Sequence, residues 1–322
     1  MRLLYLTNDR TARVCDFYGP LQRELAKVCD LTIIRRPLPV LEGRYCRMQT
    51  LEGDTNEPLV DWAQANEYDW IITDAMYSFM LERWGKIRTR KAVMWADQHG
   101  PMVKEYIGRA HALNFDLFLP LYRDSTAVFH PYLPRERVRW FPYWVDSEVY
   151  RRWSKQKLIG VLQTGVLHGL VYPWRQTVYD ALNGQDWFRR VQRPPESMER
   201  EGYWPVGKDY ARLLSEASIS TACTSKFRYP VTKLFEIPAC GTALACDWIP
   251  EMRDLGFIPG VNMIELHGEG ESLRQMVAGW LAESQQLADL TQRGFELMHT
   301  RFTAARRAAD LVTLLASYSN QP

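Results

Sequence analysis

The sequence predicts an α/β protein made of two doubly wound domains, each with a parallel sheet covered on both faces. Short apolar runs alternate with segments of helical period along the chain, which is typical of such sheets. The alternation stops at a polar, basic stretch, residues 151–157, and restarts at Leu158. A length of 322 residues also suits two domains of about 150 residues. We expect residues 1–150 and 151–302 to form two domains that face a central cleft.

The predicted strands are short apolar runs, often β-branched and bounded by Asp, Gly or Pro. In the first half they are Leu3–Thr7, Leu31–Ile34, Trp70–Thr73, Ala92–Trp95, Leu117–Leu119 and Val138–Phe141. In the second half they are Leu158–Gln163, Trp187–Val191, Ile219–Ala222, Ala243–Cys246 and Met263–Leu266. Ligands of parallel sheets bind outside the carboxyl ends of the strands, so we expect functional residues there.

Helices are predicted where apolar residues recur at helical spacing. Residues 174–182, 210–217 and 273–281 show this spacing, and an Ala- and Arg-rich helix begins near Thr303. A further helix begins near Lys233, but it contains Pro238. Because proline removes a backbone hydrogen bond from a helix, we expect that helix to be short or kinked.

Composition excludes several classes of function. The chain is 46% hydrophobic and 24% charged with a net charge of +2, which gives no strong field for nucleic acid or anionic membranes. Its six cysteines form no CxxC pair, and no zinc, EF-hand, HExxH or GxSxG pattern is present. The sequence starts directly on a strand-like run and has no apolar segment long enough to cross a membrane. We expect a cytoplasmic protein with no transmembrane segment.

The loop from Gln163 to Arg175 has features of a phosphate-binding loop. A strand ends at Gln163, Gly165 and Gly169 follow, and a helix opens near Pro173. Glycines let backbone approach a ligand, and a helix N-terminus offers N–H groups to phosphate. Arg175 in the first turn is unfavourable beside the positive end of the dipole, and binding a diphosphate would explain it. Without a complete GxGxxG or Walker pattern, an ordinary strand–helix loop with a solvated arginine fits the spacing equally well.

A second polar set precedes the predicted strand at Ala243. The cations Lys226, Arg228 and Lys233 come shortly before the carboxylate of Glu236. Cations suit phosphate, and a carboxylate can accept both hydroxyls of a ribose. Lys233 and Glu236 are one helical turn apart and share a face. The pattern indicates a nucleotide site, although Glu236 taken alone reads more simply as an exposed helix carboxylate.

A third set of polar residues follows the predicted strand at residues 92–95. Asp97 and His99 follow this strand, and Asp74 follows the neighbouring one. A His near an Asp can serve as a general base, and it can equally orient a sugar by hydrogen bonding. We therefore expect Asp97 and His99 at the edge of the cleft.

These motifs resemble the donor site of GT-B glycosyltransferases, especially the CgeB-like and family-4-like group. Lys233 and Glu236, followed by Cys240–Gly241, are similar to the basic residue, Glu and small-residue–Gly pair of that group. Tyr172–Arg175 resembles its Tyr-Pro-x-Arg element, and Pro142–Asp146 resembles its Pro-x-x-Val-Asp hinge. The resemblance extends more loosely over most of the chain.

The resemblance implies a GT-B fold, with residues 303–322 forming a helix that packs back on the N-terminal domain. It also implies that no metal ion or other cofactor is needed. The expected donor-binding residues are Gly165, His168, Tyr172, Arg175, Lys226, Arg228, Lys233 and Glu236. The expected catalytic residues are His99, Asp97, Arg175 and Lys233. Family-4 enzymes often carry a second Glu eight positions before the first, where this sequence has Arg228.

We therefore expect a glycosyltransferase that moves a sugar from a nucleoside diphosphate sugar to a small-molecule, glycan or other acceptor, with retention of anomeric configuration. If the reaction inverts, His99 or Asp97 must act as the base. One alternative is an epimerase or phosphorylase with the same fold. Another is a protein that binds a nucleotide sugar without turning it over, and the presence of Arg228 where the family often has Glu is compatible with it. A nucleic-acid acceptor is less expected. Such an acceptor would bind a cluster of basic and Trp residues near the hinge. A linker exposed to solvent would also explain these residues. The cluster consists of Arg135, Arg137, Arg139, Arg151, Arg152, Lys155, Lys157, Trp140, Trp144 and Trp153.

Overall fold

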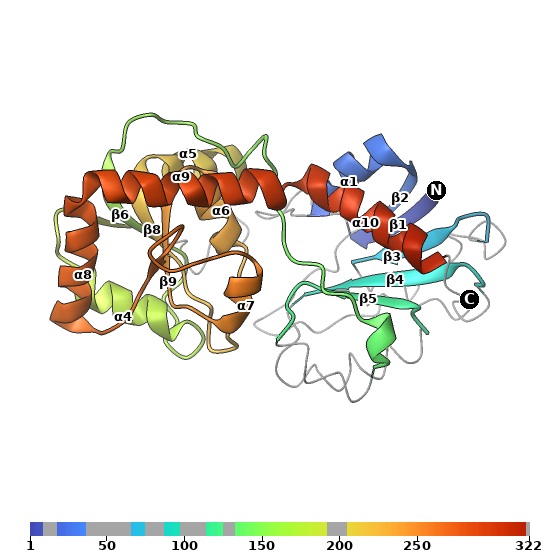
Figure 1. Ribbon diagram of the computed structural model, residues 1–322, viewed down its shortest axis with the longest axis horizontal. Helices are drawn as coiled ribbons and strands as arrows, with labels where there is room; N and C mark the ends of the chain where they lie inside the picture. The colour runs from blue at the N-terminus through green and yellow to red at the C-terminus, as the bar shows by residue number, and fades with distance from the viewer. Residues whose placement is uncertain are drawn as a thin grey trace. The chain divides into compact units, whose positions relative to one another are not determined.

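The computed structural model describes residues 1–8, 18–36, 66–74, 87–96, 114–124, 133–191 and 205–319. The chain divides into two compact units (Figure 1). Unit 1 is Met1–Pro142 with Arg307–Pro322, and unit 2 is Tyr143–Arg306. Each unit contains a five-stranded parallel sheet, which confirms the predicted fold of two doubly wound sheets.

The sheet of unit 1 has the strand order β2-β1-β3-β4-β5. Its described elements are β1 (Arg2–Asn8), α1 (Tyr18–Val28), β2 (Asp30–Arg36), β3 (Trp70–Thr73), β4 (Arg90–Trp95), β5 (Leu117–Pro120) and the 3₁₀ turn η3 (Arg135–Arg137). The strands β3 and β5 are buried along their whole length. Continuous apolar runs of this kind are expected of strands that are covered on both faces.

The last helix, α10 (Ala304–Ser319), contributes its residues from Arg307 onward to unit 1. Near its end, the Tyr318 hydroxyl donates a hydrogen bond to the carbonyl of Asp116 at 3.0 Å. The Arg90 guanidinium donates to the carbonyl of Tyr318 at 2.6 Å, and the ring of Trp70 meets the Tyr318 ring edge-on. The end of α10 is thus fixed to three strands or strand ends of this sheet (Figure 1).

The predicted strand Val138–Phe141 is wrong, because the segment is extended but forms no regular ladder. The N–H groups of Arg139 and Phe141 donate to the carbonyls of Phe118 and Pro120, each at 2.9 Å. A regular parallel ladder would also need an N–H of residue 120 that donates to the carbonyl of Arg139, and Pro120 has no N–H. Only Val138 forms a bridge with β5, so the segment borders the sheet without joining it as a strand.

The sheet of unit 2 has the order β10-β9-β8-β6-β7. Its strands are β6 (Ile159–Thr164), β7 (Phe188–Val191), β8 (Ala217–Thr221), β9 (Ala243–Cys246) and β10 (Ile264–Glu265). Its helices are α4 (Pro173–Leu182), α5 (Gly207–Ser215), α6 (Lys233–Ala239), α7 (Pro250–Asp254), α8 (Gly270–Ala282) and α9 (Ser284–Arg301). Ala217 was expected at the end of a helix, but it begins β8, because α5 ends at Ser215. The Ser215 hydroxyl forms hydrogen bonds with the carbonyls of Arg151 and Cys240.

One face of the second sheet packs against α4, α8 and the start of α9. Val161 and Ile219 from the strands meet Val178 of α4 and Val277 of α8 in a single buried cluster. The other face carries α5, since the Tyr210 hydroxyl lies 3.3 Å from Thr164 Oγ1. The sheet is therefore covered on both sides (Figure 1), as doubly wound folds require.

Strand order also fixes where a ligand should bind. In each sheet, the second strand in sequence order lies on one side of the first strand, at the edge of the sheet. The later strands lie on the other side of the first strand. The direction of winding therefore reverses between β1 and β3 in unit 1 and between β6 and β8 in unit 2. Ligands of such sheets bind at this switch point, outside the carboxyl ends of the strands. In unit 2, that place is formed by the residues that follow Thr164 and Thr221.

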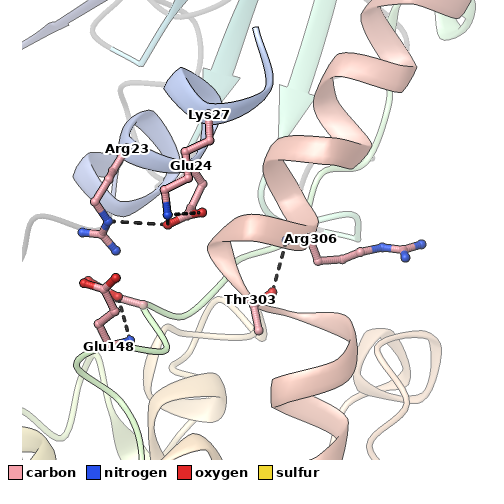
Figure 2. Close-up of polar contacts among 7 residues, drawn as sticks. Arg23, Glu24, Lys27, Glu148, Thr303 and Arg306 are labelled. Atoms are coloured by element: carbon pink, nitrogen blue, oxygen red, sulfur yellow. Dashed lines mark hydrogen bonds and ion pairs between the residues drawn. The ribbon is translucent and has the colours of Figure 1, made fainter.

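Within unit 2, the segment after Pro142 is joined to the segment between α9 and α10. Val145 N–H donates to the carbonyl of Phe302 at 2.7 Å, and Ala304 N–H donates to the carbonyl of Val145 at 2.9 Å. The Thr303 hydroxyl then accepts a hydrogen bond from the Arg306 N–H at 3.1 Å and caps α10 (Figure 2). The stretch from Tyr143 belongs to unit 2 through these bonds, whereas the sequence placed residues 143–150 in the first domain.

Helix α1 carries a charge cluster around Glu24, whose side chain is only 13% exposed. Lys27 Nζ lies 2.8 Å from Glu24 Oε1, and Arg23 Nε lies 3.5 Å from the same oxygen (Figure 2). A pair three residues apart on one helix, such as Glu24 and Lys27, contributes about 0.2–0.5 kcal/mol to the stability of the helix.

Candidate functional site

Two cations converge on Gly165, directly after β6 in unit 2. The backbone of Gly165 has φ +100°, a conformation that side-chain-bearing residues rarely adopt. A Cβ atom built there would lie 2.8 Å from Lys233 Nζ and 3.0 Å from Arg175 Nη1. Glycine is therefore required here both for the backbone turn and for the close approach of these two side chains.

Arg175 is held in the first turn of α4 with only 8% of its surface exposed. Its Nη1 donates to the carbonyl of Val166 at 2.6 Å, and its guanidinium lies 3.9 Å from the ring centroid of Tyr172. Gln163 Nε2 donates to the backbone carbonyl of Arg175 at 3.0 Å. Burial lowers the pKa of Arg175, because removal from water disfavours the charged form.

The buried charge of Arg175 has no counter-ion in the described part of the chain, where no carboxylate forms an ion pair with it. A buried charge is costly unless an opposite charge or several hydrogen bonds compensate it. The guanidinium has five N–H donors in a planar arrangement that suits phosphate. The site is thus suited to an anionic ligand.

Lys233 begins α6 and reaches back to the end of β6. Its Nζ donates to the carbonyl of Thr164 at 2.7 Å and to the Thr164 hydroxyl at 2.9 Å. The same hydroxyl contacts Tyr210 of α5. These contacts fix the ammonium beside Gly165 and next to Arg175.

Helix α6 is seven residues long, which confirms the prediction of a short helix around Pro238. Glu236 lies in this helix, one turn after Lys233, and is half-buried. Its Oε1 accepts a hydrogen bond from the Tyr150 hydroxyl at 3.1 Å. Burial raises the pKa of Glu236, while the nearby ammonium of Lys233 and the Tyr150 hydrogen bond act in the opposite direction. The carboxylate is therefore placed for hydrogen bonding in a partly dehydrated environment.

The turn at residues 225–228, after β8, is held by hydrogen bonds at two places, Thr224 and Lys226. Asp247, directly after β9, accepts hydrogen bonds from the N–H and the hydroxyl of Thr224. Lys226 N–H donates to the carbonyl of Val171 at 2.8 Å, which joins the turn to the loop before α4. Ser225 and Arg228 both have positive φ, at 63° and 52°. Non-glycine residues in this conformation often mark functional sites.

Among the residues expected from the sequence, the structure brings Gly165, Arg175 and Lys233 together and places Tyr172 on Arg175. The side chains of His168, Lys226 and Arg228 are exposed, and within the described residues they form no hydrogen bond or ion pair. The roles of these three residues stay predictions. Asp97 and His99 lie outside the described residues, so their roles stay predictions as well.

Among the described residues of this site, four were not expected from the sequence. Thr164 and Tyr210 support Lys233, Tyr150 bonds Glu236, and Asp247 holds the turn after β8. Thr164 and Asp247 stand at strand ends, the position where functional residues were expected. Tyr150 gave no comparable signal, because it reaches Glu236 across 86 positions of sequence.

The described residues contain no cluster of three or more His, Cys, Asp or Glu side chains that could hold a metal ion. Among the described helices, none has the length and apolar character needed to cross a membrane.

Comparison with known proteins finds a family match to part of the chain and a structural match to nearly the whole chain. Residues 164–313 match the family model described as glycosyl transferase-like. No curated protein is significantly similar to the chain. Among solved structures, HepE of Anabaena, solved with UDP-glucose, is 14% identical with a TM-score of 0.66, and the match covers 98% of this chain and 99% of HepE.

Two other solved structures cover nearly the whole chain. Sucrose-phosphate synthase of Thermosynechococcus elongatus is 12% identical with a TM-score of 0.66, and covers 98% of this chain and 99% of its own. A glycosyltransferase of Rickettsia africae is 7% identical with a TM-score of 0.60, and covers 100% of this chain and 99% of its own. At these identities the likeness shows the fold. The chain therefore has the GT-B fold, and its residues 164–313 match the glycosyl transferase-like family.

Proposed function

We propose that the chain transfers a sugar from a nucleoside diphosphate sugar to an acceptor and that unit 2 binds the donor. The observation that carries this proposal is the buried guanidinium of Arg175 beside the Lys233 ammonium, with no carboxylate among the described residues to neutralise it. A diphosphate supplies the missing negative charge.

The chemical role of these cations follows from where charge develops. Cleavage of the bond between the sugar and the diphosphate leaves an additional negative charge on the departing phosphate. Arg175 and Lys233 are held in place before the reaction by Val166, Tyr172 and Thr164. Fixed charges of this kind stabilise a developing charge without reorganisation. We therefore propose that no metal ion is required, because two side chains supply the positive charge.

We further propose that the reaction retains the anomeric configuration, with the departing phosphate helping to deprotonate the acceptor hydroxyl. Glu236 accepts the ribose hydroxyls in this arrangement, since it lies one turn from Lys233. The donor to test first is UDP-glucose, the ligand in the similar HepE structure. The stereochemistry is read from the anomeric proton coupling of the product by nuclear magnetic resonance.

A donor-only assay tests the activity before any acceptor is identified. The protein is incubated with UDP-glucose, GDP-mannose, ADP-glucose or dTDP-glucose, and released nucleoside diphosphate is measured with and without a panel of sugar acceptors. A transferase releases the diphosphate slowly by hydrolysis and faster with the right acceptor. An epimerase instead changes the donor sugar with no acceptor present. A protein that only binds the donor shows affinity without turnover.

Replacing Glu236 by Ala should weaken UDP binding, because the ribose loses hydrogen bonds to a charged group. Such bonds contribute about 1.5–3 kcal/mol each, so the Kd should rise at least about tenfold. The raised pKa of Glu236 adds a pH dependence: protonation removes an acceptor, so affinity should fall as pH drops through a range above that of an ordinary carboxyl. Calorimetric titration at several pH values measures both effects.

Glu236→Gln is the matched control for this pH dependence. The phosphate of UDP itself ionises with a pKa of about 6, and that contribution is the same for both proteins. The ratio of the wild-type and Glu236→Gln affinities therefore isolates Glu236. A ratio that stays constant with pH, or an Ala variant that folds and binds UDP like the wild type, would remove Glu236 from the ribose site.

A further inference from the structure

Tyr150 makes a contact that the proposed function leaves unexplained. Its hydroxyl donates to Glu236 Oε1 at 3.1 Å, and no other side chain among the described residues donates a hydrogen bond to this carboxylate. Tyr150 lies in the segment that enters unit 2, where its N–H bonds the carbonyl of Asp146 at 2.7 Å. Its ring meets the Tyr210 ring edge-on, with centroids 6.4 Å apart. The hydroxyl is thus fixed from two directions.

We propose that Tyr150 is a positioning residue that makes the nucleotide site selective for ribonucleotides over 2′-deoxyribonucleotides. The proposal rests on the proposed function, in which Glu236 binds the ribose. By bonding Oε1, Tyr150 fixes the carboxylate in one orientation and leaves Oε2 as the acceptor for a sugar hydroxyl. Tyr150 does not itself contact the nucleotide.

The selectivity follows from the surroundings of Glu236. The carboxylate is half-buried, so water compensates poorly for an absent ligand hydroxyl. A site built to bond a ligand hydroxyl discriminates strongly against an analogue that lacks it, because the site's own polar group is then left unpaired. A carboxylate free to rotate could instead turn toward water, and the discrimination would weaken.

Among the described residues, the charged and titratable groups that act on Glu236 come from three parts of the chain. Lys233 faces it from the same helix, and Tyr150 faces it from the segment entering unit 2. Cys240 follows α6 and lies near both Glu236 and the Lys157 ammonium. Of these, Lys233 and Tyr150 favour the ionised carboxylate. Loss of the Tyr150 hydroxyl should therefore move the titration of Glu236 to higher pH, since the ionised form loses a hydrogen bond.

The test compares UDP with 2′-deoxy-UDP by calorimetry in wild type, Tyr150→Phe, Glu236→Gln and the double variant. The Phe variant keeps the ring contact with Tyr210 and removes only the hydroxyl. We expect wild type to prefer UDP by about tenfold or more, and Tyr150→Phe to bind UDP about 3- to 10-fold more weakly. Binding of 2′-deoxy-UDP should hardly change. In the Glu236→Gln background, Tyr150→Phe should have no further effect on this preference.

A second readout separates positioning from a general structural role. In Tyr150→Phe, UDP affinity should begin to fall at a higher pH than in wild type. Tyr179→Phe is the matched control, because the Tyr179 hydroxyl forms no hydrogen bond with the described residues, and its UDP affinity should equal that of wild type.

Three results would overturn the inference in distinguishable ways. If Tyr150→Phe weakens both ligands equally, or changes neither, the residue does not act through ribose recognition. If wild type binds UDP and 2′-deoxy-UDP with equal affinity, the selectivity does not exist although the donor site stands. If wild type binds no nucleoside diphosphate at all, among UDP, GDP, ADP and CDP, the proposed function fails and this inference fails with it.

Discussion

Replacing Arg175 by Gln or Lys233 by Met should lower kcat about 10²- to 10³-fold, the usual cost of removing one group that stabilises a transition-state charge. Donor binding should weaken much less, because the charge on the phosphate grows as the sugar departs. Gln keeps hydrogen-bonding capacity at position 175 but loses the planar charge. Initial rates with the donor and acceptor found in the turnover assay, at several donor concentrations, separate kcat from KM.

Arg189→Ala is the control for loss of positive charge alone. Arg189 is an exposed residue of β7 on the same unit, and its removal should leave kcat unchanged. If Arg175→Gln and Lys233→Met both retain the wild-type kcat, these residues do not stabilise the leaving group. The electrostatic mechanism would then be wrong, even if the protein is a glycosyltransferase.

Gly165→Ala should weaken donor binding, because it displaces both cations at once, while the protein stays folded. The added Cβ would lie 2.8 Å from Lys233 Nζ and 3.0 Å from Arg175 Nη1, so both cations must move. The positive φ adds backbone strain of about 1–3 kcal/mol, which should lower the melting temperature. UDP affinity and thermal unfolding measure the two effects separately.

The chain offers a matched control for this glycine. Gly184 also has a positive φ, of 87°, but a Cβ there would meet nothing within 4 Å. Gly184→Ala should therefore lose stability through strain and keep its UDP affinity. If Gly165→Ala binds UDP as well as Gly184→Ala does, the close approach of the two cations to Gly165 is unrelated to donor binding.

Most of the fold could be predicted because each sheet is parallel and buried. Runs such as Trp70–Thr73 and Ala243–Cys246 match β3 and β9 residue for residue, since a strand covered on both faces must be apolar throughout. The prediction failed where local pattern does not decide. Val138–Phe141 lacks its ladder because Pro120, on another segment, has no N–H to return.

Some residues of the candidate site could be predicted from the sequence and others could not. Gly165, Arg175, Lys233 and Glu236 stand out in the sequence because glycine, cations and a carboxylate follow strand ends or open helices. The residues that orient them do not stand out. Tyr150 looks like one more aromatic residue of the linker, and only the tertiary fold brings its hydroxyl to Glu236. Supporting contacts of this kind depend on long-range packing, which a single sequence does not display.

We propose that the loops at the carboxyl ends of β6 and β8 in unit 2 bind the diphosphate of the donor. A crystal structure of the protein with UDP tests it most directly. We expect phosphate oxygens within hydrogen-bond distance of Arg175 and Lys233, and ribose hydroxyls on Glu236. UDP bound elsewhere in the molecule, or bound beside Gly165 without contact to either cation, would contradict it.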